Sequence, residues 1–354
     1  MIQQATKSIC NECYAEIGAV ADPFQEDVPM LYKVCPEHGM QRAVLEGDRE
    51  FYHAYNTYQK KNHYNILIIN VTDRCNITCP HCFYPVKNAW DMPLDSFKSA
   101  INHFRDNFTG FIISGGDPTC WEHYFEAAEW CKAEGIMLSQ LTNGVRFADE
   151  GFFSRMVTQF QTKEFLRAEL SIHPDGYNKP EVKVAQIQVL HKLRELGLKA
   201  TCVMINIDPK QCSMIETDTI MEEVFIFMQE WRDVVATFRL RPICFGWAAA
   251  QAPTLYLSHL VKSLRRTCER HAASMKLSHL KDTDNIYNQN FLIDDIDVVT
   301  VCAAPSVENI DLGYMGRGPW MLANDGRPYL VPHALIVNQG ISKGWYRGQS
   351  LAGK

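Results

Sequence analysis

Three cysteines in a C-x3-C-x2-C array, Cys75, Cys79 and Cys82, are the residues of this sequence best suited to chemistry. They follow directly after the apolar run 65–71, which has the length of a buried strand. Three thiolates can hold three irons of a 4Fe-4S cluster and leave the fourth iron open, whereas a structural metal site closes its shell with a fourth protein ligand. The array therefore predicts an iron-sulfur site with an open iron at the end of a strand.

A second group of metal-binding residues lies near the amino terminus. Cys10 and Cys13 form a C-x2-C pair, and Cys35 and His38 form a C-x2-H pair. Four such donors suit one tetrahedral ion; zinc is favoured, with mononuclear iron as the main rival because an imidazole suits either ion. A segment this short needs such a staple to hold a fold. We therefore expect a metal-binding head over residues 1–45, as a structural clasp in preference to a redox relay or docking site.

The middle of the chain alternates apolar runs with amphipathic stretches, as βα repeats do. Strands are predicted near 64–71, 110–114, 136–141, 166–172, 198–205 and 235–241. Helices are predicted between them, over 94–108, 122–134, 150–160, 182–196 and 217–232. The pattern indicates an α/β fold with a parallel sheet, and the cysteine array falls at the carboxyl end of its first strand.

Four stretches of this region resemble, in the same order, the motifs of the radical S-adenosylmethionine (SAM) enzymes. The cysteine array is similar to their cluster motif, and residues 111–118 resemble the second strand and its G-G-E-P turn, with Asp117 in place of Glu. Residues 138–144 resemble the third strand with its T-N-G ending, and residues 170–176 resemble the fourth. The resemblance covers residues 62–245 and implies a partial (β/α)6 TIM-type barrel.

The resemblance also implies how the cysteines act. Cys75, Cys79 and Cys82 would ligate a 4Fe-4S cluster whose open iron is chelated by SAM. Reduction would then cleave SAM into methionine and a 5′-deoxyadenosyl radical, which takes hydrogen from an unactivated C–H bond. The barrel would orient the target carbon and exclude water.

Residues at strand ends are implied as the contacts of SAM. They are Ser114, Gly115, Gly116, Asp117, Pro118, His81, Asn143 and Ser171. Glycine lets the backbone of the turn come close to a ligand and proline fixes the turn. The shorter side chain of Asp117 leaves its direct contact with SAM open. A surface loop residue is the alternative for His81, and a plain turn residue is the alternative for Asn143.

Two arginines lie in the sixth predicted strand. Because side chains alternate along a strand, we expect only one of Arg239 and Arg241 to face the barrel interior. The planar guanidinium of that residue would hold a carboxylate or a phosphate.

The composition fits an enzyme without a nucleic-acid partner. The chain has 354 residues, of which 46% are hydrophobic, and its formal net charge of −6 leaves no broad basic surface. It lacks the apolar core of a signal peptide and any apolar run of about 20 residues, so we expect a cytoplasmic protein without a membrane span. Thirteen cysteines in that compartment indicate metal binding, because disulfides are rare there.

The two ends of the chain narrow the interpretation further. The head, with its C-P-x-H-G ending, is similar to that of the branch containing the archaeal tetraether lipid synthases and the methanogen pterin methylases. Residues 246–354 contain a predicted helix near 255–275 and are otherwise loop-rich. We expect this region to be a cap or a substrate-binding region.

The leading hypothesis is a radical SAM enzyme that takes hydrogen from a small-molecule or lipid-like substrate. A C–C or C–heteroatom bond would follow, with electrons from a flavodoxin- or ferredoxin-type donor. One alternative is a maturase of a ribosomally made peptide, although the tail lacks the paired cysteines of an auxiliary iron-sulfur domain. Another is a zinc-bearing interaction protein, in which the array would need a fourth ligand near Cys82 and His81 is too close in sequence to supply it easily.

Overall fold

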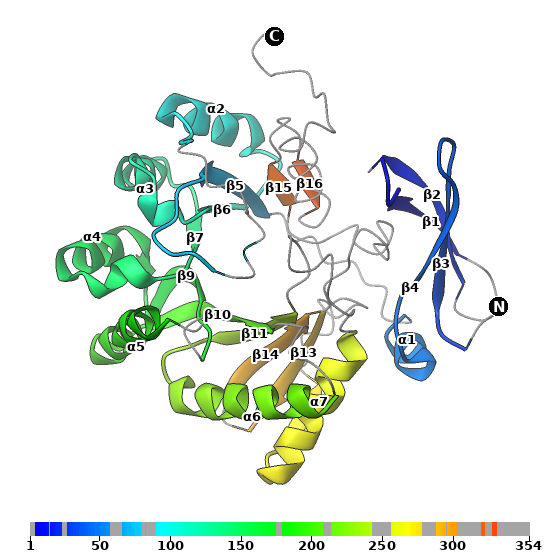
Figure 1. Ribbon diagram of the computed structural model, residues 1–354. Helices are drawn as coiled ribbons and strands as arrows, with labels where there is room; N and C mark the ends of the chain where they lie inside the picture. Colours follow the sequence, from blue (N-terminus) through cyan, green and yellow to red (C-terminus); the bar gives the residue numbers. More distant parts are fainter. Residues whose placement is uncertain are drawn as a thin grey trace.

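The computed structural model describes most of the chain. The described residues are 4–13, 15–22, 27–56, 66–79, 82, 90–174, 179–207, 214–242, 256–277, 288–294, 296–302, 320–322 and 328–330. They form a small amino-terminal sheet and a larger α/β unit (Figure 1).

The head is a four-stranded antiparallel sheet in the order β1-β2-β3-β4. Its strands are β1 (Gln4–Ile9), β2 (Glu16–Asp22), β3 (Met30–Cys35) and β4 (Gly39–Val44), and α1 (Arg49–Asn56) follows. One apolar cluster beneath the sheet consists of Ala19, Ala21, Leu31, Leu45 and Tyr52. A core of this size stabilises a sheet only weakly, which agrees with the predicted need for a metal.

Six parallel strands lie side by side in chain order. They are β5 (Ile66–Thr72), β6 (Gly110–Gly115), β7 (Leu138–Thr142), β9 (Phe165–Ser171), β10 (Lys199–Ile207) and β11 (Thr237–Pro242). The helices between them are α2 (Leu94–Phe104), α3 (Tyr124–Ala133), α4 (Glu150–Phe160), α5 (Pro180–Glu195) and α6 (Met214–Trp231). Figure 1 shows the strands in an arc with these helices on its outer side. The predicted βα alternation is confirmed, and the fold is an α/β partial barrel.

The main hydrophobic core lies between the strands and the helices. In β9, the alternate residues Leu166, Ala168 and Leu170 are fully buried in that core. Glu169 and Ser171 point to the opposite side, because successive side chains of a strand point to opposite faces. The inner side of the arc therefore carries polar residues near the carboxyl ends of its strands, where active sites of parallel barrels lie.

Strands from the last third of the chain extend the sheet at both edges. β14 (Ile296–Cys302) pairs with β11, followed by β13 (Asn288–Ile293) and β12 (Met275–Leu277). At the other edge β15 (Trp320–Leu322) pairs with β5, followed by β16 (Pro328–Leu330). These strands differ from the expected loops; the three-residue strands are too short to show the alternation that identifies a strand. Among the described helices, none has the length and apolar character to cross a membrane.

A buried carboxylate joins the head to α7 (Leu257–Arg270). The Glu46 carboxylate, 5% exposed, accepts hydrogen bonds from the hydroxyl of Ser258 at 2.5 Å and from its backbone N–H at 3.3 Å. Burial raises the pKa of Glu46, while these donors oppose that shift. A carboxylate is stabilised at a helix amino terminus by the helix dipole. The neighbouring Gly47 lies so close to the ring of Tyr256 that a Cβ would come within 2.7 Å of it.

Candidate metal and cofactor sites

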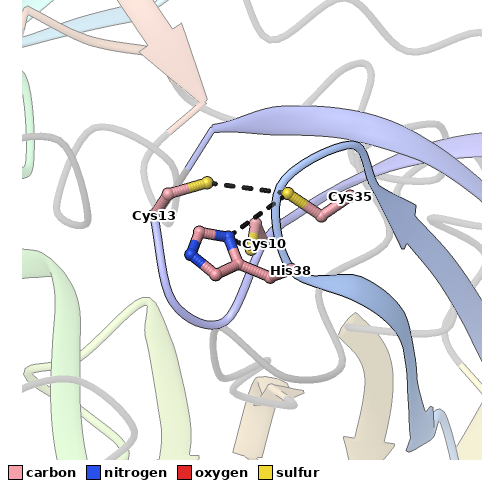
Figure 2. A group of neighbouring side chains, drawn as sticks. All are labelled: Cys10, Cys13, Cys35 and His38. Atoms are coloured by element: carbon pink, nitrogen blue, oxygen red, sulfur yellow. Dashed lines mark hydrogen bonds between the residues drawn. The ribbon is translucent and has the colours of Figure 1, made fainter.

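The four predicted ligands of the head meet at one end of its sheet (Figure 2). Cys10 and Cys13 lie at the turn between β1 and β2, Cys35 ends β3, and His38 lies in the turn before β4. Their ligand atoms all lie within 4.8 Å of one another. Sγ of Cys13 is 3.8 Å from Sγ of Cys35, and Nδ1 of His38 is 3.4 Å from Sγ of Cys35. Donors on one tetrahedral ion are separated by about 3.3–3.8 Å, so the four residues fit a single ion.

Polar contacts within the head hold the first ligand turn. Lys33 is fully buried on β3 and donates from Nζ to Oδ1 of Asn11 at 2.5 Å. Gln41 on β4 donates from Nε2 to Sγ of Cys10 at 3.4 Å. Burial acts to raise the pKa of the Cys10 thiol, but backbone N–H groups of the turn, including that of Glu12, outweigh it and lower the pKa to about 6. A thiolate is the form that binds a metal ion.

The cysteine array follows β5, as the sequence predicts. Cys75, Cys79 and Cys82 are all half-buried, and the N–H of Cys82 donates to the carbonyl of Cys79 at 3.3 Å. Within the described residues, the head is the one place where three or more potential donor residues lie within 4.8 Å of one another. The three thiols of the array therefore lie too far apart to bind one metal ion together. A 4Fe-4S cluster does not require this, because each thiolate would bind a different iron. His81 lies outside the described residues.

One carboxylate closes the loop that carries the array. Oδ1 of Asp91 accepts a hydrogen bond from the hydroxyl of Thr72 at 2.6 Å, and Oδ2 lies 2.7 Å from Nη2 of Arg74. The N–H of Asp73 donates to the carbonyl of Trp90 at 2.9 Å. These contacts join the two ends of the loop and fix where the cysteines begin. Sequence reasoning missed Asp91, because no spacing rule connects it with the array.

The glycine turn after β6 lies against the start of the same loop. The N–H of Gly116 donates to the carbonyl of Thr72, and the N–H of Asp117 donates to that of Arg74, both at 2.7 Å. Gly115 has φ +141°, and a Cβ there would come within 2.1 Å of the carbonyl oxygen of Thr72. A Cβ on Gly116 would come within 2.3 Å of the carbonyl oxygen of Arg74. Only glycine permits this approach, so the turn and the cysteine loop form one unit.

The Asp117 carboxylate connects the ends of β6 and β7. It is 1% exposed and accepts hydrogen bonds from the N–H of Thr119 at 3.0 Å, the hydroxyl of Thr142 at 2.8 Å and the N–H of Asn143 at 2.8 Å. Burial raises the pKa of Asp117, and these donors oppose that shift by stabilising the anion. Pro118, which follows in a short 3-10 turn, is also buried, as is Ser114 before the glycines.

Asp117→Asn is expected to lower the free energy of unfolding by roughly 2–3 kcal/mol, because the amide NH2 would face N–H and O–H donors and leave them buried without acceptors. The thermal unfolding temperature should fall, and less iron should be retained on reconstitution. Asp106→Asn, at an exposed position, makes the same chemical change and is expected to alter neither quantity. An Asp117→Asn protein as stable as its parent would show that the network does not hold the turn.

Asn143 and Ser171, at the ends of β7 and β9, are linked through α5. Nε2 of Gln186 donates to the carbonyl of Asn143 at 2.8 Å and to that of Ser171 at 3.0 Å. The hydroxyl of Ser171 accepts a hydrogen bond from Nδ2 of Asn206 at 3.2 Å. The structure thus brings two of the predicted residues to one edge of the sheet. Sequence reasoning missed Gln186, since a glutamine in an amphipathic helix is indistinguishable from a solvent-facing one.

Arg239 and Arg241 both lie on the inner face of β11, so the expectation that only one of them faces the interior is wrong. Residues two apart on a strand share a face, and their neighbour Leu240 is fully buried on the other side. Nη1 of Arg239 is 2.8 Å from Oε2 of Glu169. Arg241 donates from Nη2 to Oδ1 of Asn206 at 3.1 Å, so its partner is a neutral amide.

Comparison with known families identifies both units. The profile of the radical SAM superfamily matches residues 69–211, and that of the HMPTM N-terminal zinc ribbon domain matches residues 2–47. Residues 69–211 are thus a radical SAM domain, and the two matches together support a radical SAM enzyme with an amino-terminal metal-binding head. This finding confirms the enzyme hypothesis over the alternative of a zinc-bearing interaction protein.

The chain also resembles individual proteins, at low sequence identity or over a short stretch. The chain is similar to 7,8-dihydro-6-hydroxymethylpterin dimethyltransferase of Methanocaldococcus jannaschii, with 23% identity over 286 residues, 69% of this chain and 54% of the relative. It thus spans about half the length of that relative. An uncharacterized protein of the same organism is 39% identical over 54 residues, which are 15% of this chain and 19% of that protein.

Solved structures that align with part of the chain include SuiB and TYW1. SuiB of Streptococcus suis bound to the precursor peptide SuiA aligns with a TM-score of 0.45 and 17% identity, covering 62% of this chain and 49% of SuiB. TYW1 with a lysine-pyruvate adduct bound aligns with a TM-score of 0.38 and 12% identity, covering 79% of this chain and 92% of TYW1. At this similarity the comparison concerns the fold alone.

Proposed function

We propose that Cys75, Cys79 and Cys82 hold a 4Fe-4S cluster that serves the reductive cleavage of SAM. The observation that carries the proposal is the contact between the glycine turn and the cysteine loop, which holds the start of that loop, just before Cys75, against the end of β6. The donor set fits the group, because three thiolates leave one iron for SAM. When bound, the cluster supplies the electron that cleaves SAM into methionine and a 5′-deoxyadenosyl radical.

The residues of the turn would orient SAM beside that loop. The N–H groups of Gly116 and Asp117 already donate to carbonyls of the loop, so the amino group of SAM would be held by carbonyl oxygens of the turn. Asp117 would act by fixing the turn, since its carboxylate is surrounded by protein donors. The contact of His81 with the adenine stays a prediction.

The polar inner face of the sheet would bind the substrate. No carboxylate among the described residues contacts the guanidinium of Arg241, which has Asn206 as its neutral partner. A planar guanidinium in this state fits a carboxylate or phosphate group. We propose a small-molecule substrate with such a group, from which hydrogen is taken before a C–C or C–heteroatom bond forms. The similarity to a dimethyltransferase named for a pterin supports a small molecule over a lipid.

The test is anaerobic incubation of the reconstituted protein with SAM and dithionite, followed by mass spectrometry of 5′-deoxyadenosine and methionine. We expect both products in equal amounts. Extracts of the source organism grown in heavy water, separated into small-molecule, lipid and peptide fractions, then reveal the substrate class. Deuterium should enter 5′-deoxyadenosine from the small-molecule fraction. Transfer from the peptide fraction would favour the maturase alternative, and protein with a full cluster and bound SAM that forms neither product would contradict the proposal.

A further inference from the structure

We infer that Asn143 is a positioning residue for the cluster: its side-chain amide donates an N–H···S hydrogen bond to Cys75 and thereby raises the reduction potential of the cluster. The inference rests on the proposed function, in which Cys75 is a cluster ligand. It assigns to Asn143 a role on the cluster, where the resemblance to the family had suggested a contact with SAM.

The contacts of the amide nitrogen carry the inference. Nδ2 of Asn143 lies 2.8 Å from Oδ1 of Asn76 and 3.7 Å from Sγ of Cys75. The amide nitrogen carries two hydrogens, so it can serve both acceptors at once. A donor–sulfur distance of this length is ordinary for a bond to the larger sulfur atom. The amide nitrogen is therefore directed at the cysteine loop.

The orientation of this amide is fixed by its oxygen. Oδ1 of Asn143 accepts a hydrogen bond from the N–H of Val145 at 2.9 Å. A rotation of the amide by half a turn would set the NH2 group against that N–H and the oxygen against the oxygen of Asn76. Both new contacts would be repulsive, so the nitrogen faces the sulfur.

The backbone of Asn143 is held on both sides as well. Its N–H donates to Oδ2 of Asp117, and its carbonyl accepts a hydrogen bond from Nε2 of Gln186, both at 2.8 Å. The residue is only 7% exposed. Because neither water nor side-chain rotation competes strongly with these contacts, the donor is in place before a cluster binds. Asp117 thus acts on the cysteine loop through Asn143.

The expected consequence is electrostatic. A reduced cluster carries one more negative charge than the oxidised one, and that charge is shared with the cysteine sulfurs. A hydrogen-bond donor at a ligating sulfur stabilises the more negative state, and the effect is larger where the surroundings exclude water. Loss of the donor should therefore move the midpoint potential to a lower value, so that the cluster is harder to reduce.

The test is a redox titration, monitored by electron paramagnetic resonance, of reconstituted parent, Asn143→Ala and Asn143→Asp proteins without SAM. We expect a lower midpoint potential for Asn143→Ala. A still lower potential is expected for Asn143→Asp, which keeps the shape of the side chain and replaces the donor by a charged acceptor. Asn102→Asp, on the exposed side of α2, makes the same chemical change and should leave the potential unaltered.

Iron content and SAM cleavage, measured on each sample, separate this inference from the proposed function. An unchanged potential in an Asn143→Ala protein with full iron and active cleavage would overturn the inference alone. Parent protein that binds no cluster would overturn the proposed function. If the variants fail to hold iron, a measurement on the parent protein tests the inference instead. With the side-chain amides of asparagine labelled with 15N, the reduced cluster of the parent should show a 15N hyperfine coupling. Absence of this coupling would overturn the inference.

Discussion

Cys79→Ala is expected to abolish the formation of 5′-deoxyadenosine and to leave a folded protein that retains little iron. The reason is the donor count: two thiolates remain for a cluster that needs three, and the described residues place no fourth donor within 4.8 Å of two others in this loop. Product formation should fall by at least about a hundredfold, the upper range seen when the surroundings of a metal site are altered. Iron and sulfide analysis beside mass spectrometry of the product measures both effects.

The matched control is Cys131→Ala. Cys131 lies in α3 and is fully buried in the main core, where burial raises the pKa of its thiol to about 12, so it stays protonated and unreactive. Its replacement is expected to lower thermal stability slightly and to leave the iron content and the product yield unchanged. If Cys79→Ala bound as much iron as Cys131→Ala and formed the same amount of product, the assignment of the array as the cluster site would be wrong.

The repeats of the barrel were predictable because local signals agree with the packing. The helix predicted over 150–160 has those bounds in the structure, where Asp149 caps it by accepting a hydrogen bond from the N–H of Phe152 at 2.7 Å. The strands of the sheet edges were missed for the opposite reason. A strand such as β15 is defined by its pairing with β5, about 250 residues away in the sequence. Three residues are too few to show a pattern from which such a distant pairing could be predicted.

The candidate sites likewise contain features that the sequence predicted and features that it did not. The spacing of the cysteines and the histidine identified the four donors of the head, and the structure brings them together. The turn with Gly115 and Gly116 was identified by its similarity to a known sequence motif. The contacts that position these residues were not found, because they join segments far apart: Asn143 meets Cys75 across 68 residues of sequence and Gln186 across 43. An asparagine that precedes a glycine is readily explained as a turn residue. The sequence therefore gives no sign that Asn143 also contacts a cysteine.

Removal of a ligand from the head is expected to unfold the head while the barrel stays folded. In Cys35→Ala the remaining donors cannot close a tetrahedral shell, and the buried apolar cluster of the head is too small to stabilise its sheet alone. Binding of a structural zinc ion supplies roughly 10–16 kcal/mol in comparable small folds, more than the stability of most domains. Amide hydrogens of β1 to β4 should therefore exchange much faster in this variant, and the metal bound per chain should fall.

The control for this prediction is a substitution of the residue next to Cys35. Val34 is on the same strand but 59% exposed, and Val34→Ala should keep the bound metal and the slow exchange of the parent. Peptides from β5 to β11 should exchange alike in all three proteins, because their core is separate from that of the head. A Cys35→Ala protein that lost its metal yet kept slow exchange in β1 to β4 would show that the head is held by the Glu46 junction with α7 and not by its ion. Fast exchange confined to the head would show that the ion is what folds it, so that chelation would release the head from a barrel still able to cleave SAM.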